Sequence, residues 1–196
     1  MSVHHQIRAR FDERCIVVYQ AYSDAIANAA VEAQTFVPPF SYERMTWVKP
    51  SFLWMMERSG WASKPGQERV LAVHVLRTAF DAAVRSAVST SVARAHAAIR
   101  VQWDPERGLR GQKLESRSLQ LGLGRAVSRR YALEWVQRID DVTPLVRRLA
   151  ALRRAGSYDE AERALPKERA YPLAFAPQGL FTTESPEHGR CSSNSE

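Results

Sequence analysis

The stretch RMTWVKPSFLWMMERSGWASKPGQERVLAV, residues 44–73, combines helix, turn and strand signals with an unusual density of tryptophans and cations. Pro50 suits the first position of a helix, so PSFLWMMERS is predicted to form a short helix that ends at Gly60. The SKPGQ that follows is typical of a turn, and ERVLAVHVL (68–76) predicts a buried strand. A hydrophobic core would account for the tryptophans. It would not account for the cations, which are Arg44, Lys49, Arg58, Lys64 and Arg69.

Strand and helix patterns continue in both directions from this stretch. Upstream, CIVVYQ (15–20) predicts a buried strand, followed by a helix with Ser23 at its N-cap. Downstream, an alanine-rich helix is predicted from Arg77. The remaining predicted elements are the strand IRVQWD (99–104), which is expected to stop at Pro105, the strand SRSLQLGLG (116–124), and the helices RAVSRRYALEWVQRI, PLVRRLAALRRAG and SYDEAERALP.

This mixture predicts an α+β protein with a single compact domain over residues 1–177. We expect small mixed or antiparallel sheets with flanking helices, and a helical C-terminal part at about 142–166. Residues 178–196 are rich in Ser, Glu and Gly and are predicted to be disordered. The sequence has no apolar run of about 18 residues, so no membrane partner is expected. It also has no signal-peptide pattern and only two, widely separated cysteines, so a cytoplasmic location is expected.

The formal net charge of +7 favours an anionic partner such as a nucleotide or nucleic acid. Arginine dominates the basic residues, because only four of the 28 are lysines. A general preference for arginine, giving an ordinary solvated basic surface, is therefore the favoured alternative. Against this background Lys49 and Lys64 are distinctive, because each directly precedes a proline.

Common catalytic and metal-binding motifs are missing from the sequence. The five histidines lack the spacing of a zinc site, so no metal is expected. No nucleophile elbow or Walker motif is present. LGLGRAV (121–127) places two glycines between a strand and a helix, where backbone N–H groups can hold a phosphate. A tight turn into the helix is the favoured interpretation of these glycines.

Polar side chains interrupt the predicted strands at several positions. Tyr19 and Gln20 lie near the end of the first strand, and Gln120 lies within a later one. Strand alternation places Gln102 and Asp104 on one face, although Asp104-Pro105 is also typical of an ordinary turn. A buried glutamine needs hydrogen-bond partners. These residues therefore indicate either an internal polar network or a polar pocket lined by strand ends.

The tryptophans and cations of residues 44–73 allow two interpretations. Tryptophan can stack on a base while cations hold the phosphates, or lysine and arginine stems can lie over indoles in a core. The seven-residue spacing of Trp47, Trp54 and Trp61 would place them on one helix face, but Pro50 and Gly60 interrupt such a helix. The lysines at chain breaks favour a segment that faces a ligand.

Several segments together resemble the family called domain of unknown function 4291 over about residues 5–172. They are VYQAYSDAIA, FVPPFSYERMTWVKPSFLWMMERSGWASKPGQERVLAV, VQWDPERG, RSLQLGL and DVTPLVRRL. This family name implies no activity.

A more distant resemblance is to ADP-ribosyltransferase-type folds, and it is based on the order of a strand with VYQA, a helix, the FVPPF loop and a Ser/Thr-aromatic segment. It implies NAD as cofactor, bound in a cleft between two small sheets. The first-strand position would fall on Tyr19 and Gln20, and the second on Thr46 or Ser51. The third, normally a glutamate that holds the nicotinamide ribose, would fall on Gln102, Glu106 or Gln120.

The resulting hypothesis is a nucleotide-binding, ADP-ribosyltransferase-like enzyme that uses NAD and acts on nucleic acid or a nucleotide. Tyr19 and Gln20 would orient the ligand, and Gln102 or Glu106 would contact the ribose. Two alternatives remain: a non-catalytic nucleic-acid-binding module, and a structural or partner-binding protein. The expected cofactor-binding residues are Arg44, Lys49 and Lys64 on the phosphates, Trp47 as the stacking ring, and Thr46 and Ser51.

Overall fold

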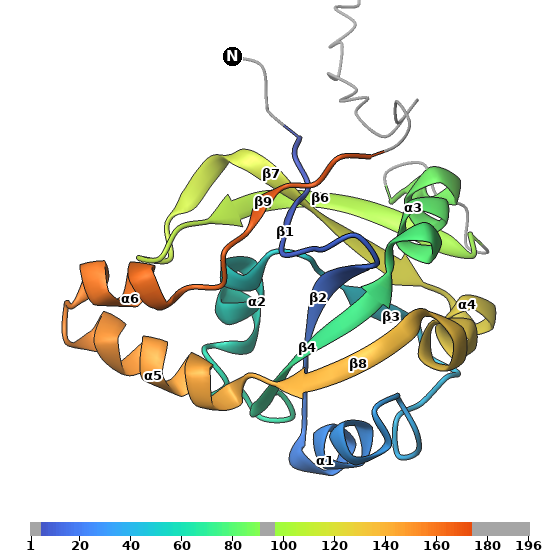
Figure 1. Ribbon diagram of the computed structural model, residues 1–196, viewed down its shortest axis with the longest axis horizontal. Helices are drawn as coiled ribbons and strands as arrows, with labels where there is room; N and C mark the ends of the chain where they lie inside the picture. The colour runs from blue at the N-terminus through green and yellow to red at the C-terminus, as the bar shows by residue number, and fades with distance from the viewer. Residues whose placement is uncertain (1–4, 91–96, 174–196) are drawn as a thin grey trace, which may run out of the picture.

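The computed structural model describes residues 5–90 and 97–173 (Figure 1). Predictions for residues 91–96, for Cys191 and for the tail at 178–196 lie outside these ranges. The elements in chain order are β1 (Arg8–Ala9), β2 (Cys15–Tyr22), α1 (Asp24–Ala33), β3 (Thr46–Val48), α2 (Phe52–Ser59), β4 (Arg69–Leu76), α3 (Arg77–Ser86), β5 (Val88–Ser89), β6 (Ile99–Arg107), β7 (Lys113–Leu123), α4 (Arg125–Arg130), the π-helical turn η1 (Tyr131–Trp135), β8 (Val136–Asp141), α5 (Thr143–Arg154), α6 (Tyr158–Ala164) and β9 (Arg169–Ala170).

Two small sheets form the centre of the fold. One has the antiparallel order β2-β4-β8, and the other has the order β3-β7-β6-β5, in which only the β5–β6 pair is parallel. The strands of the two sheets cross in Figure 1, with α5 and α6 on one side and α3 and α4 on the other. A backbone hydrogen bond from Tyr19 N to Lys49 O, 2.7 Å long, ties β2 to the chain just after β3. The predicted α+β class with small sheets is confirmed.

Strand β2 is buried on both faces, which explains its nearly continuous apolar sequence. Ile16 and Val18 belong to the core cluster that the two sheets share with α1 and α3. Val17 and Tyr19 point the other way and pack in a second cluster with α2 and α5. This alternation decides which polar side chains of β2 can reach a cavity.

The helix predicted within residues 44–73 exists, but its first residue is Phe52 and not the expected Pro50. Ser51 is the N-cap of α2, and its Oγ accepts a 3.2 Å hydrogen bond from Trp54 N. Pro50 lies outside the helix. Gly60 ends the helix as predicted, with a left-handed φ of 59° that glycine adopts without strain.

Three predicted boundaries are wrong. The helix that starts at Arg125 ends at Trp135, because Val136–Asp141 pairs with β4 as the strand β8. The alanine-rich helix, predicted over residues 77–98, ends at Ser86, and Val88–Ser89 pairs with β6 as the strand β5. Strand β6 continues through Pro105 to Arg107. Proline is tolerated at this position because β6 pairs there with β7 alone, and the ladder shifts register beside it.

Among the described residues, none of the helices combines the length and the apolarity that crossing a membrane requires.

Candidate functional site

A cavity of about 800 Å³ lies between the end of β2, the strands β3, β6 and β7, and the helix α2. We call it the large cavity. Its walls bring together many of the residues that the sequence singled out, although they come from segments up to 100 positions apart: Gln20, Arg44, Thr46, Trp47, Lys49, Gln102 and Gln120. They also include Asp104, Tyr22, Phe40, Trp54 and Arg58.

Asp104 is the centre of the polar wall. Lys49 Nζ lies 3.0 Å from its Oδ2, and Gln120 Nε2 donates to the same oxygen at 2.9 Å. Gln102 Nε2 donates to Oδ1 at 2.8 Å. The antiparallel register of β6 and β7 produces this group, since Gln102 and Asp104 are two residues apart on one face of β6. The predicted shared face is confirmed, and the Asp-Pro turn is not found.

Lys49 is a buried cation, only 1% exposed. Its ammonium lies 3.8 Å from the centroid of the Trp54 ring and 3.4 Å from Ser118 O. Burial lowers the pKa of Lys49 to about 8, while the neighbouring Asp104 carboxylate acts in the opposite direction. Lys49 therefore holds Asp104 in place through a buried ion pair. This role differs from the predicted one, in which Lys49 is a cation that binds phosphates.

Trp47 offers an aromatic surface on β3, on the same sheet face as Gln120 of the neighbouring strand β7. Its partner in the β3–β7 ladder is Gly122, and a Cβ on Gly122 would lie 2.9 Å from Trp47 Cη2. The indole therefore lies close against the sheet because residue 122 has no side chain. Gly122 thus has a packing role, and Gly124 is the N-cap of the six-residue helix α4. The favoured interpretation, a tight turn into the helix, therefore applies to Gly124, whereas Gly122 lies within β7.

The predicted phosphate-binding cations lie in different places. Arg44 and Arg58 are exposed and line the large cavity. Lys64 does not line it. Its Nζ donates to the carbonyl oxygens of Glu57 and Arg58, at 3.3 and 2.8 Å, in the last turn of α2. Lys64 therefore caps a helix C-terminus, where a cation is favoured.

Three predicted ligand residues are engaged inside the protein. Tyr19 is 1% exposed and packs edge-on against Phe52, with the ring centroids 5.2 Å apart. Gln20 accepts a 2.7 Å hydrogen bond from Tyr131 Oη, and its amide nitrogen donates to Tyr22 Oη and Trp47 O. Thr46 is buried, and its hydroxyl lies 2.9 Å from that of Ser128. Gln20 thus belongs to an internal polar network, whereas Gln102 and Gln120 belong to a pocket.

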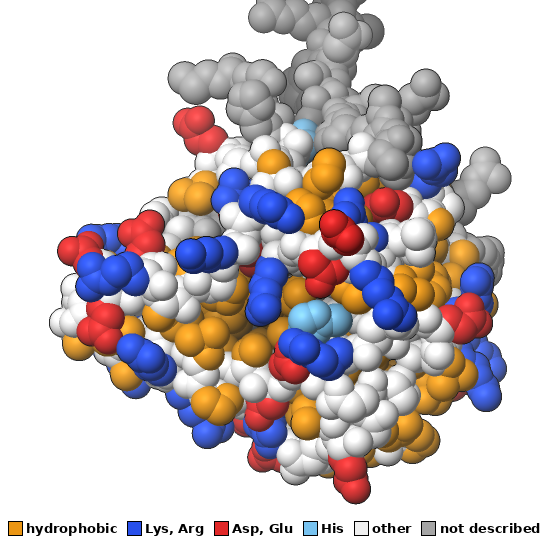
Figure 2. Space-filling view, in the orientation of Figure 1, with side chains coloured by type: hydrophobic (Ala, Val, Ile, Leu, Met, Phe, Trp, Pro, Cys, Tyr) orange, Lys and Arg blue, Asp and Glu red, His pale blue; other side chains and the backbone are white. Residues whose placement is uncertain are grey.

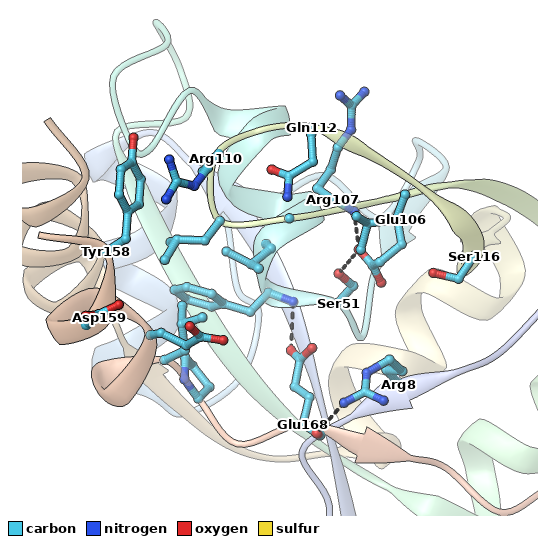
Figure 3. Close-up of a pocket in the computed structure, with 18 residues that line it drawn as sticks. Arg8, Ser51, Glu106, Arg107, Arg110, Gln112, Ser116, Tyr158, Asp159 and Glu168 are labelled. Atoms are coloured by element: carbon cyan, nitrogen blue, oxygen red, sulfur yellow. Dashed lines mark hydrogen bonds between the residues drawn. The ribbon is translucent and has the colours of Figure 1, made fainter. Parts of the chain in front are cut away.

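Ser51 and Glu106 line a second cavity of about 480 Å³, which we call the small cavity (Figure 3). Ser51 Oγ donates to Glu106 Oε1 at 2.7 Å, and Arg107 N donates to the same oxygen at 2.8 Å. Glu168 Oε1 accepts from Phe52 N at 2.7 Å, at the start of α2. The single site expected from sequence is therefore divided between two cavities.

Glu168→Gln should stabilise the protein near neutral pH. Burial raises the pKa of Glu168 to about 8, from an ordinary value of 4.5. The native state therefore binds more protons than the unfolded state between about pH 4.5 and 8, and the free energy of unfolding falls as pH rises through this window. Glutamine keeps the acceptor for Phe52 N and removes the charge. We expect a gain on the order of 2 kcal/mol at pH 8 and none at pH 4.5.

Urea unfolding at several pH values measures this effect. Glu162→Gln is the matched control, since Glu162 lines the same cavity but is exposed. Equal pH profiles for wild type and Glu168→Gln would contradict the assignment.

The surface shows charges of both signs. On the face seen in Figure 2, basic side chains are interspersed with acidic ones. Ion pairs account for part of this pattern, including Arg148 with Glu160 at 3.2 Å and Arg138 with Asp140 at 2.6 Å. His74 Nε2 lies 2.9 Å from the same Asp140 carboxylate. This face therefore has no uniform basic patch of the kind that tracks a nucleic-acid backbone.

Sequence reasoning left two important residues out of the candidate site. Asp104 shares its strand face with Gln102, so alternation alone indicated it. Glu168 carried no such signal, because it follows a predicted helix end and is brought to α2 by the tertiary fold. Among the described residues, no group of three or more His, Cys, Asp or Glu side chains is arranged to hold a metal ion.

The fold and the large cavity together define an α+β protein with two small sheets and a polar, aromatic-walled cavity. The chain belongs to the family Domain of unknown function (DUF4291), whose model matches residues 6–171. No curated protein matches the sequence.

Proposed function

We propose that the large cavity binds a nucleotide, with NAD as the first candidate. One observation carries this proposal. An aromatic surface, a set of amide and carboxylate groups, and exposed arginines line one cavity of about 800 Å³. This volume lies within the usual range for small-molecule and cofactor sites. The combination matches the three parts of a nucleotide, namely a flat base, a polar sugar and anionic phosphates.

Each part has a chemical partner on the walls. Trp47 provides a face on which a base can stack, and such stacking stabilises binding by about 1–3 kcal/mol per base. Asp104 can accept from ribose hydroxyls at its partly exposed edge, since its side chain is 16% exposed. Arg44 and Arg58 are at the surface, where a guanidinium can bind phosphate through two N–H groups.

The catalytic form of the proposal is an ADP-ribosyltransferase-like reaction on nucleic acid or a nucleotide. An acceptor nucleophile would attack C1′ of the nicotinamide ribose and lose its proton to a base. The N-glycosidic bond would break, and nicotinamide would leave with the bonding electrons. Asp104 is the carboxylate on the walls of the large cavity. We therefore assign to Asp104, in place of Glu106 and Gln102, the stabilisation of the positive charge that develops on the ribose.

Thermal shift and intrinsic fluorescence with NAD, ATP, AMP and a short single-stranded oligonucleotide test this function. Each ligand is measured at two salt concentrations. We expect saturable stabilisation by mononucleotides and a change in tryptophan emission, because Trp47 and Trp54 line the cavity. Arg44→Ala and Arg58→Ala should weaken ATP binding without lowering the melting temperature.

Two results would contradict the proposal. One is the absence of any shift with NAD, ATP and AMP. The other is binding of the oligonucleotide alone with a steep salt dependence, which would indicate a nucleic-acid-binding module.

A further inference from the structure

Two glutamines face each other across the β6–β7 ladder in the large cavity. Gln102 and Gln120 are direct partners in the antiparallel register. The Cβ atoms of such partners lie about 5 Å apart on one sheet face. Both side chains are partly exposed and line the cavity.

The orientation of both amides is set by Asp104. A carboxylate that is paired with the Lys49 ammonium accepts hydrogen bonds and donates none. The group that each glutamine turns toward Asp104 must therefore be its NH₂, at 2.8 Å for Gln102 and 2.9 Å for Gln120. The amide assignment, which is often ambiguous between oxygen and nitrogen, is thus chemically determined here.

As a result, both carbonyl oxygens face away from Asp104. Among residues 5–90 and 97–173, no side chain or backbone group donates a hydrogen bond to the Oε1 of Gln102 or Gln120. Gln20 offers a useful contrast, because its Oε1 is occupied by Tyr131 Oη. The large cavity therefore presents two neighbouring acceptors whose orientation is fixed by a third residue.

We propose that Gln102 and Gln120 select a ligand that carries a flat heteroaromatic group with an NH₂ substituent, the exocyclic amine of a base or a carboxamide. This inference rests on the proposed nucleotide site and names the chemical group it recognises. The two N–H bonds of an NH₂ group diverge by about 120°. With hydrogen bonds of about 2.9 Å they reach two acceptors about 5 Å apart. The Cβ atoms of cross-strand partners, from which the two glutamine amides extend, are about as far apart.

The same arrangement rejects close analogues. A ligand with a carbonyl oxygen or a carboxylate at this position would face the two glutamine carbonyl oxygens, which accept hydrogen bonds and donate none. The two carbonyl oxygens would then face the ligand without a donor, and such mismatches reduce affinity much more than the loss of an apolar contact does. Toward the NH₂ group, Asp104 and Lys49 act as positioning residues, because Asp104 orients the two glutamine amides and Lys49 holds Asp104.

Calorimetric comparison of matched ligands on the wild-type protein tests the inference. AMP is compared with IMP, in which an oxygen replaces the amino group. NAD is compared with two analogues. The nicotinic acid analogue replaces the carboxamide by a carboxylate, and the hypoxanthine analogue replaces the adenine amino group by an oxygen. We expect AMP to bind at least about tenfold more tightly than IMP. For NAD, weaker binding of the hypoxanthine analogue assigns the adenine end to the glutamines, and weaker binding of the nicotinic acid analogue assigns the nicotinamide end.

The double variant Gln102→Met/Gln120→Met gives an independent test, because methionine has a similar length and no carbonyl. The preference for AMP over IMP should fall to within about threefold. Gln137→Met is the control, since Gln137 is exposed on β8 outside the cavity, and it should retain the wild-type preference.

Two outcomes would overturn the inference, and they are distinguishable. Equal binding of AMP and IMP, together with equal binding of NAD and both analogues, would reject the NH₂ selection while leaving a nucleotide site in place. Absence of binding by all five ligands would reject the nucleotide site and the selection with it.

Discussion

Asp104→Ala should destabilise the protein by about 3–5 kcal/mol, because it leaves the Lys49 ammonium buried without a partner charge. Lys49 is 1% exposed, and its other polar contact is a 3.4 Å hydrogen bond to Ser118 O. Neutral backbone cannot replace the carboxylate at 3.0 Å. Lys49→Met should cost much less. Methionine fills the space of the lysine stem over Trp54, and Asp104 keeps two glutamine donors and contact with the solvent in the cavity.

Urea unfolding of the two single variants and the double variant Lys49→Met/Asp104→Ala measures this asymmetry. The double variant should be more stable than Asp104→Ala alone, because it removes the buried charge together with its partner. Asp159→Ala, at an exposed aspartate of α6, should cost about 1 kcal/mol or less. Additive losses in the double variant would show that Lys49 and Asp104 act independently, contrary to the 3.0 Å ion pair.

Trp47→Ala should lower the affinity for AMP and NAD about 10- to 100-fold, because it removes the ring on which the base stacks. Trp47 is the preferred stacking ring, since Lys49 covers one face of Trp54. Trp47→Phe should recover part of the affinity with a smaller aromatic face. The melting temperature should change little in Trp47→Phe, because the phenyl ring still covers Gly122.

The control for this prediction is Trp61→Phe. Trp61 follows α2 and packs with the core cluster on the other side of that helix, where the Arg153 guanidinium lies 5.4 Å from its ring. It does not line the large cavity, so its replacement should leave nucleotide affinity unchanged. A Trp47→Ala variant that binds AMP as tightly as wild type would place the base elsewhere.

Local patterns predicted many of the secondary-structure elements. The apolar runs correctly predicted β2 and β4, and Gly60 correctly predicted the end of α2. These signals depend only on residues that are close in sequence. Strand β8 was missed because Val136–Asp141 becomes a strand only through pairing with β4. The same limit applies to Pro105, since its tolerance depends on β6 having a partner on one side there.

The candidate site was predicted in part, and Lys49 shows why. The scarcity of lysine and its place before a proline drew attention to this residue as a cation for phosphates, and its side chain lines the large cavity. Sequence could not show that its charge is matched by Asp104, which lies 55 residues away. Likewise, Ser51 and Glu106 were grouped with Lys49 and Gln102. The start of α2 and the end of β6 place them at the small cavity instead.

Isothermal titration calorimetry of NAD into the wild-type protein and the Trp47→Ala variant, in the same buffer, tests the central claim most directly. The account predicts a saturable one-to-one heat for wild type and a binding constant about 10- to 100-fold weaker for the variant. No measurable binding to wild type, or equal affinity for the two proteins, would contradict a nucleotide site in the large cavity.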